Sequence, residues 1–315
     1  MPAITASAPG KIILFGEHAV VYSRPAIAVP VSKVRARAVI SANPRGKPGQ
    51  VHIQAPDIEL ETELSDLPGD HPLAFTLHLT LEELKIERVP ACTLRISSTI
   101  PISAGMGSGA AVSVAVVRAF SIFLGRPLGE DQISALVYQI EKLHHGTPSG
   151  IDNTVITYAK PVYFMREKPF EFLHLPKPFC IVIGDTGIPS PTAVAVGDVR
   201  RLWLENPAAY EPLFDAVGNL VVQARRLLET GEVDGLGALM DENHAYLQKM
   251  GVSSPELDDF VKKARLSGAL GAKLSGGGRG GNMIALVNEA SSTEVMEALK
   301  RAGSHRVIET TIQAG

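Results

Sequence analysis

The sequence predicts an α+β fold with two domains. Its 315 residues are roughly twice the ~150 residues of a typical domain. Apolar residues make up 45% of the chain and charged residues 20%, a globular composition with enough aliphatic material for one or two cores. Short apolar runs and helical patterns follow one another irregularly, which favours α+β over a regular alternation of strand and helix.

The first half of the chain is rich in strand patterns. Short apolar or β-branched runs predict strands at residues 12–15, 26–31, 34–40 and 93–96. Apolar residues at helical spacing predict helices over residues 73–84, 110–124 and 131–144. A glycine-rich turn at 105–109 comes directly before the second of these helices, so we expect that helix to begin at the turn.

The second half is dominated by helical patterns. They predict helices over residues 192–205, 208–230, 233–250, 255–268 and 292–302. Strands are expected at residues 179–183, 283–287 and 306–312. The proline-rich segment 160–178 is the best linker candidate. The expected domains are therefore residues 1–170 and 171–315.

Charge and cysteine content exclude several classes of protein. The net charge is −3, and the basic and acidic residues form no long runs, so the chain lacks the basic footprint of a nucleic-acid binder. Cys92 and Cys180 are too few for a tetrahedral metal cage and are expected to be reduced thiols. Neither a signal peptide at Met1 nor a membrane-spanning stretch is predicted. We expect a cytoplasmic protein without a membrane partner.

The glycine-rich turn is the first candidate for chemistry. Residues 101–111 read PISAGMGSGAA and precede an apolar helix. Glycines let the backbone approach a ligand closely, and the N-terminus of a helix attracts anions. The turn is neither a Walker A loop nor a dinucleotide fingerprint. A plain turn with a helix cap remains the alternative to a phosphate cradle.

Two carboxylates, eleven residues apart, form the second candidate. Glu141 lies near the end of a predicted helix, and a Pro-Ser-Gly turn then presents Asp152. One carboxylate could ligate a metal ion while the other acts as a base. The alternative is purely structural, with a helix C-cap at Gly146 and a capping role for Asp152.

Two further segments carry polar residues next to apolar runs. Lys11 begins an apolar run, where its side chain either reaches the surface or points into a site. Glu17 and His18 follow that run as a polar pair. Residues 273–281 are rich in glycine, which indicates either a flexible loop or a close approach to a ligand.

The order of these motifs resembles that of the GHMP kinases, a family named for galactokinase, homoserine kinase, mevalonate kinase and phosphomevalonate kinase. The matching stretches run from Ser7 to about Leu286 and read APGKIILFGEHAVVY, PISAGMGSGAAVSVA, EKLHHGTPSGIDN, DTGIPSPT, MDENHAYLQKMGVSSPELD and GAKLSGGGRGGNMIAL. Among them GEHAVVY, HGTPSGIDN and NHAYLQKMGVS resemble the mevalonate kinase branch of the family. The resemblance implies a domain like ribosomal protein S5 domain 2, followed by a ferredoxin-like domain.

The resemblance also implies roles for individual residues. Asp152 is implied as the catalytic base, with Lys11 beside it. Glu141 is implied as a ligand of Mg²⁺, and Ser108 as a second one. Substrate binding is implied for Glu17, His18 and Thr192. ATP binding is implied for Pro101, Ser103, Ala104, Gly105, Met106, Gly107, Ser108, Gly109, Ala110 and Ala111.

Two residues depart from the family pattern. Gly109 stands where the family has a second serine near Mg²⁺, so Ser108 or water must take that place. The alternative is that the backbone at Gly109 needs φ > 0 or lies too close to phosphate for any Cβ. Arg279 stands where the third motif has glycine, which implies either a stiffer loop or a phosphate contact through its guanidinium.

The implied activity is the transfer of a phosphoryl group from ATP to the primary hydroxyl of mevalonate. Phosphomevalonate or homoserine as the acceptor stays open, as does a sensor that has lost turnover. A nucleic-acid partner is disfavoured by the charge balance, and a homodimer is left open.

Overall fold

The chain forms two compact units. The computed structural model describes residues 3–101, 105–145, 149–190 and 192–315. The first unit consists of Met1–Gly10, Val34–Pro101 and Gly107–Ala159. The second unit consists of Lys11–Lys33, Ile102–Met106 and Lys160–Gly315. These units differ from the expected stretches 1–170 and 171–315, because residues 11–33 pack with the C-terminal part of the chain.

Long strands run through both units. The strand β1 (Ile4–Phe15) pairs with β2 (Ala26–Ala42). The sequence predicted two strands in place of β2, but exposed Ser32 and Lys33 continue the extended backbone between them. Short 3-10 helices lie at Ala19–Tyr22 (η1), Pro56–Ile58 (η2), Leu64–Asp66 (η3) and Val233–Gly235 (η4).

In the first unit, β5 (Cys92–Ser98) is flanked by two strands. It pairs antiparallel with residues 36–42 of β2 and parallel with β3 (Val51–Ala55). The edge strand β4 (Leu60–Glu63) pairs antiparallel with β3. The alternating burial of β3 fits a strand with one face on the core.

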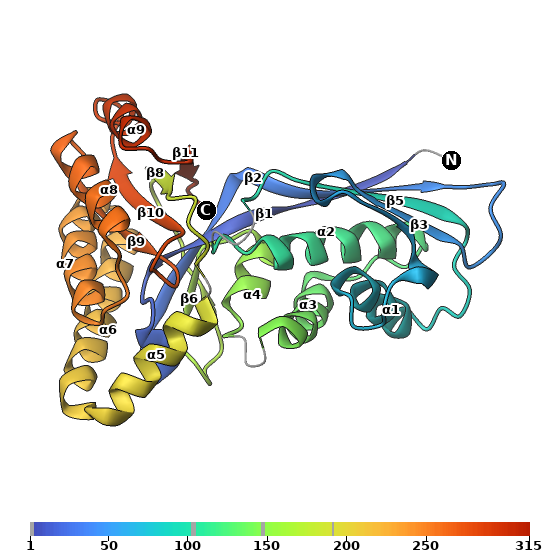
Figure 1. The fold of residues 1–315 in the computed structure, drawn as a ribbon, viewed down its shortest axis with the longest axis horizontal. Helices are drawn as coiled ribbons and strands as arrows, with labels where there is room; N and C mark the ends of the chain where they lie inside the picture. The colour runs from blue at the N-terminus through green and yellow to red at the C-terminus, as the bar shows by residue number, and fades with distance from the viewer. Residues whose placement is uncertain (1–2, 102–104, 146–148, 191) are drawn as a thin grey trace. The chain divides into compact units, whose positions relative to one another are not determined.

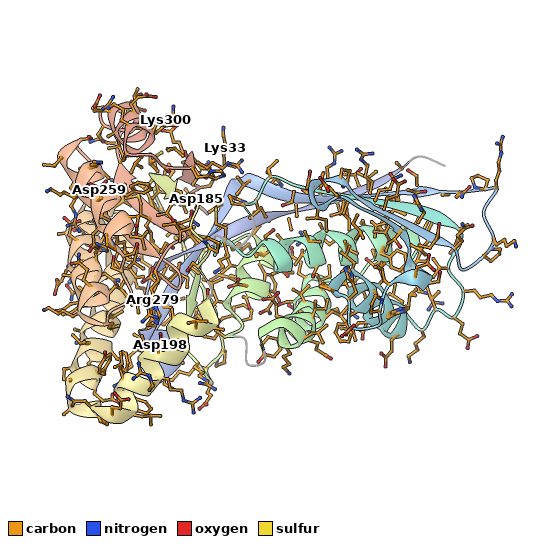
Figure 2. The ribbon with its side chains drawn as sticks, in the orientation of Figure 1. Lys33, Asp185, Asp198, Asp259, Arg279 and Lys300 are labelled. Carbon is orange, nitrogen blue, oxygen red and sulfur yellow. The ribbon has the colours of Figure 1, made fainter. Side chains whose placement is uncertain are left out.

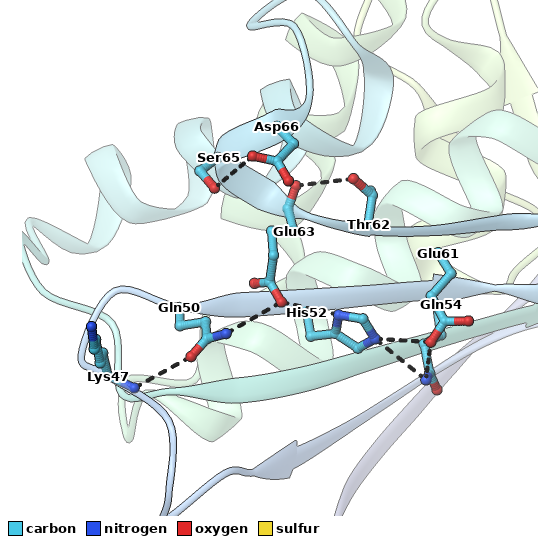
Figure 3. A network of polar contacts seen from close by, with 9 residues as sticks. All are labelled: Lys47, Gln50, His52, Gln54, Glu61, Thr62, Glu63, Ser65 and Asp66. Atoms are coloured by element: carbon cyan, nitrogen blue, oxygen red, sulfur yellow. Dashed lines mark hydrogen bonds and ion pairs between the residues drawn. The ribbon is translucent and has the colours of Figure 1, made fainter.

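Polar side chains tie the edge strand to its neighbour (Figure 3). The imidazole of His52 lies between two carboxylates, with Nε2 3.1 Å from Glu61 Oε1 and Nδ1 3.1 Å from Glu63 Oε1. The hydrogen bond with Glu61 is the main cause that raises the pKa of His52 above its ordinary value. Charged residues on an edge strand discourage pairing with another chain, so this network protects the edge.

Helices cover one face of the first unit's strands (Figure 1). They are α1 (Pro72–Leu84), α2 (Ser108–Phe123), α3 (Glu130–His145) and α4 (Ile151–Tyr158). Most of α2 is buried, including Val114, Val117 and Phe120. A helix that is apolar nearly all round belongs in a core, so α2 forms the centre of this unit.

The second unit holds a four-stranded antiparallel sheet in the order β11-β8-β10-β9. The strands are β8 (Phe179–Asp185), β9 (Gly271–Ser275), β10 (Asn282–Val287) and β11 (Arg306–Ile312). This strand order is ferredoxin-like, as the family resemblance implied. The linker prediction for 160–178 was wrong in part, because β6 (Val162–Phe164) and β7 (Glu171–Phe172) lie there and β6 pairs with β2.

Helices pack on one face of this sheet (Figure 1). The helices of the second unit are α5 (Thr192–Glu205), α6 (Pro207–Thr230), α7 (Leu236–Lys249), α8 (Pro255–Leu266) and α9 (Ser292–Arg301). Asn206 and Ser254 cap α6 and α8 through side-chain acceptors. No helix in the described ranges is both long and apolar enough to span a membrane.

The helix α7 meets strand β9 at two glycines. A Cβ at Gly237 would lie 2.1 Å from Leu270 O, and one at Gly271 would lie 2.0 Å from Gly237 O. Both distances are far below van der Waals contact with rigid backbone atoms. Glycine at both positions therefore sets the distance between the helix and the strand.

Replacing Gly237 by alanine should lower the free energy of unfolding by about 1–3 kcal/mol, because the added methyl group overpacks the contact. Urea denaturation measures the change. Gly197→Ala is the matched control, since Gly197 is exposed in α5 and a Cβ there would meet no atom within 4 Å. The control should gain about 0.5–1 kcal/mol. An equal gain in both variants would show that the close contact imposes no constraint.

Candidate active site

The glycine-rich turn ends at the N-terminus of α2. Gly107 is the N-cap residue with φ 70°, and Gly105 has φ 75°. Ala111 N donates to Gly107 O at 2.9 Å, which closes the first helical turn. The first N–H groups of a helix have no acceptor within the helix, so this end of α2 suits an anion. The predicted binding residues Ser103 and Ala104 lie outside the described residues.

The carboxylate of Glu141 faces this helix start. Glu141 is buried, and a Cβ at Gly109 would lie 3.8 Å from Glu141 Oε1. Gly109 is exposed and helical, and its φ is not positive. The side of the helix that carries residue 109 is thus open to a side chain, and any such side chain would approach Glu141. Ser108, the first residue of α2, is half-buried.

Asp152 lies in the first turn of α4. The turn begins at Gly150, whose φ of 89° requires glycine or a strained residue. Asn153 anchors the helix, because its Nδ2 donates to Ser134 Oγ at 2.9 Å and to Ser134 O at 3.2 Å. Asn153 is buried whereas Asp152 is half-buried. No role was predicted for Asn153 from the sequence, although it lies within the HGTPSGIDN stretch.

In the second unit, Lys11 lies beside Met106 of the glycine-rich turn. Lys11 N donates to Met106 O at 3.0 Å. The side chain of Lys11 is buried, with 6% of its surface exposed. Lysine is rarely buried unless its ammonium has a partner, so this side chain does not belong to a solvated face.

His18 and Thr192 both lie against the second glycine-rich segment, residues 273–281, at Gly277. His18 Nε2 lies 3.0 Å from Gly277 O, so Nε2 carries the proton and donates it. A Cβ at Gly277 would lie 3.1 Å from Thr192 Oγ1. Ser190 also contacts this loop, since its hydroxyl donates to Gly278 O at 2.6 Å. Two of the three predicted substrate-binding residues therefore lie against one loop.

Glu17, the third, is paired with Lys273. Both side chains have 0% exposure, and Lys273 Nζ forms an ion pair with Glu17 Oε1. Burial raises the pKa of Glu17 and lowers the pKa of Lys273, and the pairing opposes both shifts. Lys273 was not predicted as a site residue, since a lysine inside a strand offers no signal of its partner.

Arg279 stiffens the glycine-rich loop (Figure 2). Its guanidinium pairs with Asp198 of α5, and its backbone N donates to Val252 O at 2.8 Å. The φ of Arg279 is 59°, a left-handed conformation that favours glycine. Of the two implied roles for Arg279, this geometry supports the stiffer loop, because the guanidinium is engaged within the protein.

Acid should destabilise the protein through two buried histidines. Burial lowers the pKa of His18 to about 4 and that of His244 to about 4. Between pH ~6.5 and ~4 the unfolded chain binds protons that the folded chain does not, so stability falls as the pH falls, by about 1.4 kcal/mol per pH unit and histidine. Urea unfolding at several pH values measures the slope. His244→Gln should flatten the slope, and an unchanged slope would contradict this account.

A divalent cation would have few protein ligands. Among the side chains that the structure describes, in residues 3–101, 105–143, 149–190 and 192–315, no group of three or more His, Cys, Asp or Glu could hold a metal ion. Mg²⁺ keeps several waters and commonly needs only one or two carboxylates together with phosphate oxygens. Glu141, a buried carboxylate of α3 that faces the N-terminus of α2, fits that requirement.

Comparisons with known proteins identify the family. Residues 73–160 match the GHMP kinases N terminal domain, and residues 224–305 match the GHMP kinases C terminal domain. Mevalonate kinase of Pyrococcus horikoshii is 36% identical, with 99% of this chain and 96% of that protein covered. Mevalonate kinase of Thermococcus onnurineus is 38% identical, with 97% and 95% covered.

Solved structures agree. The crystal structure of L. major mevalonate kinase in complex with R-mevalonate has a TM-score of 0.86 and 31% identity, with 99% of this chain and 96% of that chain covered. The Methanococcus jannaschii mevalonate kinase structure also has a TM-score of 0.86, at 27% identity, with 100% and 99% covered. The chain belongs to the GHMP kinases and is an enzyme with their two-domain fold. Within that family, its similarity over nearly the whole chain is to mevalonate kinases.

Proposed function

We propose that the enzyme transfers the terminal phosphoryl group of ATP to the primary hydroxyl of mevalonate, giving 5-phosphomevalonate and ADP. The observation that carries the proposal is the buried Glu141 carboxylate facing the α2 N-terminus, which follows Gly105 and Gly107, two glycines with positive φ. That arrangement suits a polyphosphate together with a cation. The 36–38% identity to mevalonate kinases supports the choice of acceptor.

The glycine-rich turn, two carboxylates and one lysine supply the groups for ATP and for proton transfer. In this proposal the backbone N–H groups of residues 105–110 bind the β- and γ-phosphates. Glu141, with the Ser108 hydroxyl, would hold Mg²⁺, which neutralises phosphate charge when bound. Asp152 accepts the proton of the acceptor hydroxyl. Lys11 neutralises charge that develops on the transferred group and on Asp152.

The acceptor is oriented by His18 and Thr192 in this proposal. Both contact the loop at Gly277, and because Nε2 of His18 donates to Gly277 O, the neutral imidazole keeps Nδ1 as a hydrogen-bond acceptor for a substrate hydroxyl. Glu17 is engaged by Lys273, so we assign it a supporting role behind His18. Most of the rate should come from positioning and electrostatics, because phosphoryl transfer demands little covalent work from the protein.

An ADP-release assay with a panel of acceptors tests the function. We expect saturable, ATP-dependent release with mevalonate and background release with phosphomevalonate, homoserine and galactose. Equal or faster release with another acceptor would reassign the substrate. Background release with every acceptor, from a protein that still binds ATP, would favour a sensor.

Gly107→Val should abolish ATP binding in a folded protein. The φ of 70° at Gly107 is strained for a β-branched residue, and its side chain would intrude where backbone meets phosphate. Isothermal titration with ATP measures the affinity, and circular dichroism reports the fold. Wild-type affinity in the folded variant would contradict the phosphate cradle.

A further inference from the structure

A series of contacts joins the segment 13–18 to the segment 273–277. Ser275 Oγ donates to Ile13 O at 2.8 Å. Lys273 pairs with Glu17, and His18 donates to Gly277 O at 3.0 Å. The ion pair and the histidine contact therefore hold two adjacent residues of one turn, Glu17 and His18, against strand β9 and the loop that follows it.

The turn at His18 needs support from its surroundings. His18 has φ 60° and ψ −48°, a strained conformation for a residue with a side chain. Such backbone persists when neighbouring contacts hold it, and it is frequent where a side chain must be aimed at a ligand. The hydrogen bond from Ala19 N to Glu17 O at 2.7 Å shows how tight the turn is.

An ion pair that is fully buried, such as Lys273–Glu17, is unusual in a protein core. Both side chains are fully buried, and a buried ion pair is often no more stabilising than apolar residues of the same volume. Lys273 Nζ also donates to Leu274 O at 2.6 Å, which fixes the ammonium on its own strand. A role in fixing geometry accounts for the pair better than a role in stability.

Lys273 is the charged partner that the structure describes for Glu17. Asn243 of α7 lies near the carboxylate and helps to lower its pKa, but it does not reach hydrogen-bond geometry. Within the described residues, Glu17 Oε2 and both amide atoms of Asn243 have no hydrogen bond. Loss of the ammonium would therefore leave Glu17 free to move toward Asn243.

We propose that Lys273 is a positioning residue for acceptor recognition: by holding Glu17, it fixes the adjacent His18 imidazole against Gly277. This inference rests on the proposed role of His18 in binding mevalonate. Lys273 itself touches neither ATP nor acceptor in this account. Its effect passes through Glu17 and the backbone of the turn.

The kinetic test compares Lys273→Met with the neutral pair Glu17→Gln/Lys273→Met. The double variant leaves no unpaired buried charge, so it remains informative where the single variant does not fold. We expect the KM for mevalonate to rise about 10-fold or more, since a small misplacement of a binding group is costly, while the KM for ATP changes less than ~2-fold. Lys263→Met, which removes an exposed ion pair with Asp259, is the control and should change neither value.

A second measurement reads the position of His18 without turnover. Imidazole ¹⁵N resonances of the full-length protein report the Nε2–Gly277 hydrogen bond, and His18→Gln assigns the signal. We expect the His18 resonance to move in the neutral pair variant and to stay in Lys263→Met. A folded neutral pair variant with a wild-type resonance and a wild-type KM for mevalonate would overturn the proposal.

The proposed role of His18 in binding mevalonate is tested separately by His18→Ala. An unchanged KM for mevalonate in that variant would refute the role of His18 in binding mevalonate, and with it the rise in KM expected for the Lys273 variants. The resonance of His18 would still decide whether Lys273 positions the ring. His18→Ala can also be combined with the neutral pair variant. If His18→Ala raises the KM for mevalonate and the two changes add independently in the combined variant, Lys273 does not act through His18 and lies outside the recognition of mevalonate.

Discussion

Replacing Asp152 by asparagine should lower kcat by about 10²–10⁴ while the affinity for ATP stays nearly unchanged, the usual loss for a positioned acid–base group. Asparagine keeps the shape of the side chain but cannot accept the proton of the acceptor hydroxyl. The helix that carries residue 152 is fixed by Gly150 and by the buried Asn153, neither of which the change touches. The fold should therefore persist.

Steady-state ADP release and ATP titration measure the two quantities. Asp131→Asn is the matched control, since Asp131 lies in the first turn of α3 as Asp152 lies in the first turn of α4. We expect wild-type kcat for Asp131→Asn. A kcat for Asp152→Asn above about a third of the wild-type value, a change well under ~1.4 kcal/mol in the barrier, would remove Asp152 from the role of base.

Helices of the C-terminal half could be predicted well from the sequence, and short strands could not. The helix 192–205 and the strand 306–312 have the predicted bounds, because each presents a clear periodicity. The strands β6 and β7 hold three and two residues among prolines. A run that short carries no periodicity, and its conformation depends on the strand that pairs with it.

Turns in the site could be predicted from the positions of glycines, whereas ion pairs between residues far apart in the sequence could not be predicted. Glycine permits the positive φ that Gly107 and Gly150 adopt, so turns at these two positions could be expected from the residue type. The Lys273–Glu17 pair joins residues 256 positions apart, and the sequence held no sign that the two would meet. The same holds for Arg279 and Asp198, since many charged residues could have served as the partner.

Glu141→Gln should raise the Mg²⁺ concentration needed for half-maximal activity at least ~10-fold. Even the loss of a residue that only hydrogen-bonds a metal ligand typically lowers metal affinity by about that factor. The amide keeps the shape and the burial of the side chain but removes the charge that a hard cation prefers. If the carboxylate is the main protein ligand, extra Mg²⁺ should restore much of the rate. Rate loss that Mg²⁺ does not alter would mean that Glu141 acts elsewhere.

Gly109→Ser tests whether a missing hydroxyl explains this reliance on Glu141. A Cβ at residue 109 would lie 3.8 Å from Glu141 Oε1, in ordinary contact, and the backbone is helical without positive φ. We therefore expect a folded, active variant whose Mg²⁺ requirement falls or stays unchanged. Gly109→Ala is the control, because it adds the same Cβ without a hydroxyl, and a lower requirement for serine than for alanine would assign the gain to the oxygen. Activity lost in both variants and not restored by Mg²⁺ would instead mean that phosphate approaches the backbone at residue 109 too closely for any side chain.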